Sequence, residues 1–187
     1  MQITMKISRE QVAKNREALL EAAARLFRER GFESVTVAEV MNAAGLTHGA
    51  FYGYFKSKED LIAQAFNHVL TPKDGVRGAD RAGMAKYADA YLSAAHRDEL
   101  GDACPFSSLG TEAVRGSGEL RHVLTESLRA QIESFSKTVP GRTAEQRRRA
   151  AIGSWAAMIG AMMLSRIADD PALSEEVLRE TRAFIGA

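Results

Sequence analysis

The segment GLTHGAFYGYFKSKEDL, from Gly45 to Leu61, concentrates side chains that can form hydrogen bonds. Thr47, His48, Tyr52 and Tyr54 donate or accept hydrogen bonds, and none of them carries negative charge. Aromatic residues make up only 7% of the chain, so their crowding here calls for an explanation. Side chains of this kind suit contact with the base edges and phosphates of nucleic acid.

The surrounding sequence predicts two short helices joined by a tight turn. Thr36 and Glu39 have the spacing of a capping box, which starts a helix. Gly45 suits a turn that needs positive φ, and Thr47 can cap the helix that follows. Residues 36–54 therefore have the helix-turn-helix layout, in which the second helix enters the DNA major groove.

The side chains of this second helix divide by direction. Gly49 and Ala50 are small, so the helix backbone can approach base edges closely. Phe51 and Phe55 are expected to face inward and to hold the helix at its angle. They should pack on residues of the two preceding helices, namely Leu26, Phe27 and Val40.

The rest of the chain also reads as helix, and no segment shows the alternation typical of a strand. Residues 1–56 are predicted to form a three-helix DNA-binding domain, and 57–83 a connecting helix with a linker. Residues 84–187 should form a C-terminal bundle, so the fold class is all-α. Its helices are expected over residues 84–96, 107–115, 119–139, 144–168 and 174–185.

Composition limits the other possibilities. The chain has 187 residues and a net charge of +1, so positive charge for nucleic acid must be local. Cys104 is the single cysteine, which excludes an intramolecular disulfide. The most apolar run, Trp155 to Ile167, is shorter than the roughly 20 residues that span a bilayer. We expect a cytoplasmic protein with no membrane contact, no cofactor and no metal.

The skeleton RGF…T…AGL…G-FY-YF-SKEDL, in which a dash marks any residue, lies between Arg16 and Leu61. It resembles the DNA-binding region of the tetracycline-repressor (TetR) family. The resemblance covers about a third of the chain. It implies a homodimer in which each subunit places its third helix in a major groove of palindromic double-stranded DNA. It also implies phosphate contacts from Thr36, Tyr52, Tyr54 and Lys58, and a base-facing set formed by Thr47, His48, Gly49 and Ala50.

Several of these positions have a second interpretation. Thr47 could serve only as a helix cap, and Tyr52 and Lys58 could lie on a solvated face. His48 could be a structural histidine. Four basic residues at the chain start either contact phosphate or form a solvated tail, namely Lys6, Arg9, Lys14 and Arg16.

In the resembling family the C-terminal half binds an effector and dimerises. Aromatic and methionine side chains here either line an effector cavity or form ordinary core, namely Tyr87, Tyr91, Phe106, Phe135, Trp155 and Met158. A seam of small residues on the long helix and the end of the last helix are expected at the dimer interface. These residues are Gly153, Ala157, Gly160, Ala161, Leu164, Ala183 and Phe184.

Cys104 precedes Pro105 at the start of a predicted helix, which resembles a subgroup of the family with Cys-Pro at this place. A thiol near a helix N-terminus, close to His96 or Arg97, could react as a thiolate with electrophiles. Nearby acidic residues oppose that ionisation, and a small buried structural cysteine is the alternative.

The sequence thus predicts a ligand-responsive DNA-binding regulator, a repressor released by a small molecule or electrophile, and not an enzyme. The alternatives are a dimeric helical ligand-binding protein without DNA binding and a thiol-dependent enzyme. The four histidines are scattered, and no Cys–His pair has the spacing of a known motif.

Overall fold

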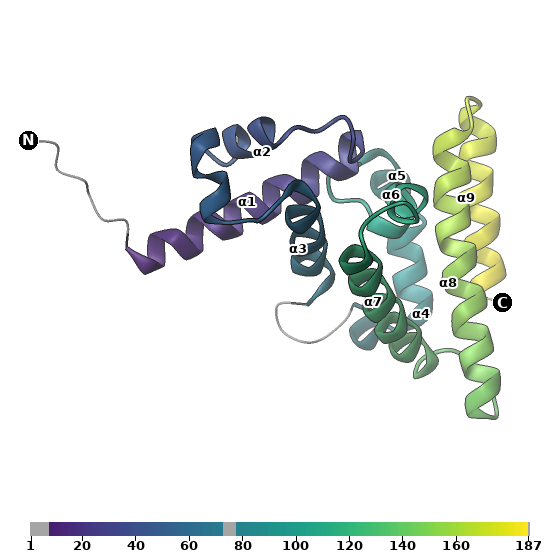
Figure 1. Ribbon diagram of the computed structural model, residues 1–187. Helices are drawn as coiled ribbons and strands as arrows, with labels where there is room; N and C mark the ends of the chain where they lie inside the picture. The colour runs from purple at the N-terminus through teal and green to yellow at the C-terminus, as the bar shows by residue number, and fades with distance from the viewer. Residues whose placement is uncertain (1–7, 73–77, 187) are drawn as a thin grey trace, which may run out of the picture.

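The structure, a computed structural model, describes residues 8–72 and 78–186. For residues 78–82 it describes the backbone alone. The described residues are helical and include no strand, which confirms the all-α prediction (Figure 1). The elements are α1 (Arg9–Arg30), α2 (Val37–Ala43), the 3-10 helix η1 (His48–Gly53), α3 (Lys58–Leu70), α4 (Gly78–Tyr91), α5 (Ala94–Asp98), α6 (Pro105–Ala113), α7 (Gly118–Ser136), α8 (Ala144–Ile167) and α9 (Pro171–Gly186).

Helix starts follow the local capping chemistry of the sequence. Thr36 forms both bonds of its capping box with Glu39, and Thr143 does the same at the start of α8. The Ser8 and Ser57 side chains accept backbone N–H bonds at the starts of α1 and α3. Each cap satisfies a backbone donor that the first helical turn leaves free.

The prediction of a single helix over residues 84–96 is wrong. Helix α4 ends at Tyr91, and Ser93 caps a separate short helix, α5, by accepting from the His96 backbone N–H at 3.2 Å. The chain direction changes at this break. As a result, His96 packs against the Tyr91 ring at a centroid distance of 4.5 Å.

Two apolar cores hold the molecule together. The first joins α1, α2, η1 and α3, and it also takes Leu109, Ala113 and Leu120 from α6 and α7. Phe32 lies edge-to-face against both Phe27 and Phe66 in this core. The predicted connecting helix, α3, is therefore part of the first core.

Phe51 and Phe55 are 3% and 2% exposed within that core, which confirms their inward direction. The second core lies between α4, α7, α8 and α9, around Trp155 and Phe135. In Figure 1 the α8–α9 pair forms the edge of the molecule farthest from α2. Among the described helices, α8 alone is long and apolar enough to cross a membrane, by length and composition only, and its Trp155 and Met158 pack in this core.

The end of α1 is fixed by a contact between the two halves. Gly31 ends α1 with φ 82° and ψ 166°, so its φ is positive but its ψ lies outside the left-handed helical region. A Cβ atom at Gly31 would lie 2.8 Å from the Glu112 Oε1 atom. The other oxygen of Glu112, in α6, accepts the Phe32 backbone N–H at 2.6 Å. Only glycine leaves room for this carboxylate and adopts this backbone conformation without strain.

Gly31→Ala should therefore destabilise the fold by about 1–3 kcal/mol, because alanine at this φ and ψ is strained and its Cβ meets Glu112. The measurement is thermal unfolding followed by circular dichroism, where each kcal/mol corresponds to about 2–4 °C for a chain of this size. Gly118→Ala is the matched control, because a Cβ there meets nothing within 4 Å. An unchanged melting temperature for Gly31→Ala would contradict this account.

Candidate nucleic-acid interface and internal cavity

The turn between α2 and η1 is closed by backbone hydrogen bonds. Gly45 has φ 71°, and its N–H donates to the Asn42 carbonyl at 2.9 Å. The Leu46 N–H reaches back to the Met41 carbonyl at 2.9 Å. These bonds satisfy the carbonyls at the end of α2 and fix the angle at which η1 leaves it.

The second helix of the motif is a 3-10 helix and not the α-helix that we expected. The Ala50 N–H donates to the Thr47 carbonyl at 3.0 Å. The Thr47 side chain forms no cap hydrogen bond, so its predicted capping role is wrong. Its hydroxyl is therefore available to a partner outside the chain.

The start of η1 is open to solvent. Thr47, His48 and Gly49 are exposed, and a Cβ at Gly49 would meet nothing within 4 Å. The Tyr52 side chain is 78% exposed, which is unusual for a large aromatic residue. Ala50, in contrast, is half-buried against the first core, so it acts mainly as a spacer.

Tyr54 is half-buried and connects η1 to α1. Its hydroxyl accepts a hydrogen bond from the Asn15 Nδ2 amide at 3.2 Å. Arg16, the next residue of α1 after Asn15, places its guanidinium 5.9 Å from the centre of the Phe55 ring. The orientation of η1 therefore depends on polar and cationic side chains of α1 as well as on its apolar anchors.

Thr36 already uses its hydroxyl inside the protein. The hydroxyl donates to Glu39 Oε2 at 2.8 Å and accepts the Glu39 N–H at 3.2 Å. The Thr36 backbone N–H, which donates to Glu39 Oε2 at 2.7 Å, lowers the pKa of Glu39 to about 2, together with the Thr36 hydroxyl and Arg30 at 2.8 Å. A phosphate at this helix start would compete with the Glu39 carboxylate, so the phosphate role of Thr36 stays a prediction.

The basic candidates differ in their surroundings. Lys58 begins α3 and borders a groove of about 310 Å³ that also includes Glu33, Glu59 and Glu112. Lys14 forms an ion pair with Glu10 at 2.7 Å, Arg9 is exposed, and Lys6 lies outside the described residues.

Comparisons with known proteins bear on this geometry. Residues 19–65 match the family described as bacterial regulatory proteins, tetR family. The likeness to this family thus covers about a quarter of the chain. This match confirms the resemblance seen in the sequence.

Individual relatives show how far the likeness extends. The repressor KstR2 of Mycolicibacterium smegmatis is 37% identical over 60 residues, which are 32% of this chain and 29% of that protein. The regulator YfiR of Bacillus subtilis is 30% identical over 95 residues, 51% of this chain and 45% of that protein. The matched region thus spans less than half of these relatives' lengths. The reduced form of E. coli NemR has the same fold, with TM-score 0.71, 23% identity and coverage of 91% and 94% of the two chains.

A cavity of about 330 Å³ lies where α1 and α3 meet the C-terminal half of the chain. Five predicted effector residues line it, namely Tyr87, Tyr91, Cys104, Phe106 and Trp155. Phe135 and Met158 are fully buried in the second core and do not line it, so those two predictions are wrong. His96, which was expected near Cys104, lines the cavity as well. No signal in the sequence indicated three other polar lining residues, namely Arg28, Ser127 and Gln131.

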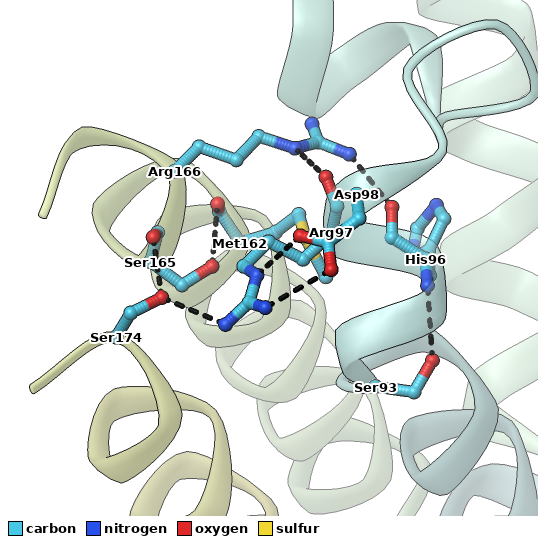
Figure 2. Close-up of polar contacts among 8 residues, drawn as sticks. All are labelled: Ser93, His96, Arg97, Asp98, Met162, Ser165, Arg166 and Ser174. Carbon is cyan, nitrogen blue, oxygen red and sulfur yellow. Dashed lines mark hydrogen bonds and ion pairs between the residues drawn. The ribbon is translucent and has the colours of Figure 1, made fainter. Parts of the chain in front are cut away.

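A polar network next to the cavity joins α5, α6, α8 and α9. Arg166 of α8 donates to the Arg97 and His96 carbonyls at 3.0 and 2.9 Å, which satisfies the end of α5 (Figure 2). It also donates to the Ser107 hydroxyl at 3.3 Å. Arg97 reaches Ser174 of α9 at 3.0 Å. The short helix α5 is thereby fixed to the helices around it.

Cys104 lies at the start of α6 with its thiol buried. Burial raises the pKa of the Cys104 thiol, although Tyr91, two α6 backbone N–H groups and Arg166 act in the opposite direction. His96 does not serve as its base. The His96 Nδ1 atom bonds the Tyr91 carbonyl at 2.7 Å, and Nε2 accepts the Cys104 backbone N–H at 3.3 Å. Burial also lowers the pKa of His96, so the ring is neutral and occupied.

The predicted dimer residues fall into two groups. Ala161 is 4% exposed inside the second core, so it is unavailable to a partner and that prediction is wrong. Phe184 and Leu164 are 75% and 58% exposed. Gly153 and Ala183 are exposed, and Ala157 and Gly160 are half-buried.

One group of side chains has the spacing of metal ligands. The ligand atoms of Glu17, Glu21 and His68 lie within 4.8 Å of one another between α1 and α3. The two carboxylates are exposed, and exposed acidic groups often cluster without an ion. The cluster therefore supports no functional assignment.

The native Cys104 thiol should react slowly with a thiol reagent such as Ellman's reagent at pH 8. We expect a rate at least roughly tenfold below that of the urea-unfolded chain, because burial suppresses both the thiolate and reagent access. Cys104 is the only cysteine, so the absorbance change reports this thiol alone. Equal rates in the two states would contradict this account of burial, and a faster rate in the folded chain would favour the electrophile-sensor interpretation.

Proposed function

We propose that this protein is a ligand-responsive, dimeric DNA-binding repressor of transcription that acts in the cytoplasm. The observation that carries the proposal is the open face of η1, where Thr47, His48, Gly49 and Tyr52 are exposed on a firmly anchored element. The TetR family match of residues 19–65 and the repressor name of its relative KstR2 support the same conclusion.

We assign base reading mainly to His48 and Thr47. Gly49 has no side chain and Ala50 is half-buried, which leaves few side chains for hydrogen bonds to bases. Tyr52 is assigned to phosphate, because its hydroxyl projects from the same exposed face. Lys58 is assigned to a phosphate at the start of α3.

We further propose that two copies pair through α8 and α9. Large apolar side chains are exposed on these two helices, namely Ile152, Leu164, Ile167, Leu173 and Phe184. An apolar set on two adjacent helices favours a partner surface. A symmetric pair would place two η1 elements about one DNA turn, roughly 34–36 Å, apart on a palindrome.

Release from DNA is assigned to a small molecule in the 330 Å³ cavity. Val69 and Leu70, at the end of α3, line that cavity. A ligand there would displace α3, which shares the first core with η1, and so change the spacing of the two η1 elements. This is a shift between DNA-competent and DNA-incompetent populations.

The alternatives are a helical ligand-binding protein without DNA binding and a thiol-dependent enzyme. Neither predicts salt-dependent binding to a palindrome. A gel shift with DNA from upstream of the chain's own gene separates them, because phosphate contacts make regulator binding fall steeply with salt. Absence of any shift at low salt would rule out the regulator.

Substitutions at the interface should separate base reading from phosphate contact. His48→Ala should weaken specific binding by about 1–3 kcal/mol and leave binding to random DNA unchanged. Lys58→Gln should weaken binding to specific and to random DNA alike. It should also reduce the slope of log affinity against log salt concentration by about one. Lys86→Gln is the control, because Lys86 is exposed on α4 in the other half of the chain. If His48→Ala keeps the same preference for specific over random DNA, His48 does not read bases.

Phe184→Glu should convert the dimer to a monomer, because it places a charge in the apolar α8–α9 surface. Sedimentation velocity measures the mass, and the gel shift should lose affinity in parallel, since one subunit then reads only half of the palindrome. Lys137→Glu is the control, because Lys137 is an exposed residue at the end of α7. A dimeric Phe184→Glu variant would contradict this interface.

A further inference from the structure

The cavity between the two halves collects all of the buried polar side-chain atoms that lack a hydrogen-bond partner within the described chain. These atoms are Arg28 Nε, Tyr91 Oη, Gln131 Nε2 and Trp155 Nε1. All four residues line the same 330 Å³ cavity. They come from α1, α4, α7 and α8, so the clustering arises from tertiary structure and not from one local segment.

Such groups are costly to leave unpaired. Tyr91, Gln131 and Trp155 are 5%, 7% and 4% exposed, so bulk solvent does not compensate them. The Tyr91 hydroxyl lies near Cys104 and Ser107, but neither contact has hydrogen-bond geometry. A buried donor without a partner loses its hydration without compensation, so a ligand that supplies acceptors is favoured at this place.

The unpaired groups specify the chemistry of that ligand. The Arg28 and Trp155 nitrogens can only donate, and the Gln131 amide nitrogen donates as well. Arg28 is also a cation whose side chain is 9% exposed, and its partner Asp102 lies 3.7 Å away on a side chain that is 88% exposed. Burial lowers the pKa of Arg28, and Asp102 acts in the opposite direction without reversing this effect. An anion within the cavity would compensate it better than this distant, hydrated carboxylate.

The walls of the cavity are aromatic. Tyr91 and Phe106 lie edge-to-face on Trp155, at centroid distances of 5.3 and 6.0 Å. A cavity of about 150 Å³ holds benzene. At 330 Å³, this one suits one or two rings with a polar group.

We propose that this cavity binds the carboxylate form of a small aromatic acid, with the carboxylate at Arg28 and Gln131 and the ring against Trp155. This ligand class deepens the proposed function and rests on it for the effect on DNA, whereas the binding itself is independent of DNA. Arg28 belongs to α1, so the ligand contacts the DNA-binding unit directly. Asn15, which donates a hydrogen bond to Tyr54 at the end of η1, lies on the same helix as Arg28. The two residues are about 20 Å apart at roughly 1.5 Å per residue.

The test uses the fluorescence of Trp155, the only tryptophan, in the full chain. Benzoate and phenylacetate are titrated against their neutral counterparts benzamide and phenylacetamide. We expect saturable quenching by the carboxylates with dissociation constants below about 1 mM, as ligands of this size allow. The amides should bind at least roughly tenfold more weakly, because they lack the charge-assisted bond to Arg28.

Variants assign the carboxylate to its partners. Arg28→Gln should weaken carboxylate binding at least roughly tenfold and leave amide binding unchanged, whereas Arg28→Lys should retain part of it. Arg25→Gln is the matched control, because Arg25 is exposed on the same helix and is paired with Glu29 at 3.1 Å. Gln131→Glu, nearly identical in shape, should also weaken carboxylates through repulsion. It decides the matter if Arg28→Gln fails to fold.

The outcomes separate this inference from the proposed function. Equal binding of acids and amides, or unchanged affinity in both Arg28→Gln and Gln131→Glu, overturns the inference. Absence of quenching up to about 10 mM by any probe overturns it as well. If carboxylates bind as expected but no DNA is shifted, the inference stands and the proposed function fails. If both stand, benzoate should release DNA from the native chain and not from folded Arg28→Gln.

Discussion

Helix α1 is the constraint on which both halves of the molecule depend. Its middle packs in the first core through Leu19, Ala23 and Phe27, which are fully buried. Its first turns hold Tyr54 through Asn15, and its last turn delivers Arg28 to the cavity. A helix transmits displacement because its backbone hydrogen bonds resist bending. Any change at one end of α1 therefore reaches the other end with little loss.

The two cores and the cavity represent opposite uses of burial. In the first core, Phe27, Phe32 and Phe66 pack edge-to-face on one another. In the cavity, polar donors are buried beside aromatic rings and remain unpaired. Folding alone does not favour that arrangement, because an apolar filling would be more stable. The free energy lost by leaving these donors unpaired is recovered when a ligand supplies acceptors to them.

Features that depend on neighbouring residues could be predicted from the sequence, whereas features that depend on tertiary packing could not. Caps such as Thr36 with Glu39 act over three residues, so their chemistry could be read directly. The inward direction of Phe51 and Phe55 followed from their spacing. The 3-10 form of η1 could not be read, because it depends on the tight turn at Gly45 and the tertiary anchors around it. Arg28 was missed because it looks like any basic residue near a helix end, and only tertiary packing brings it to Gln131. Met158 and Phe135 had the right chemistry, but periodicity does not distinguish a core wall from a cavity wall.

The cavity contacts the DNA-binding unit at several points, and this bears on how a ligand could act. Arg28 lies on α1, and Leu70 lies at the end of α3. Cys104 begins α6, whose far end carries Glu112 against the backbone of Phe32. A ligand bound as proposed would therefore contact three elements that each pack in, or bond to, the core beneath η1. A long chain of intermediate residues is not needed, because one displacement of the α1 end changes Arg28, Gly31 and the Glu112 contact together. The response should then be cooperative, since these contacts share one helix and cannot be rearranged one at a time.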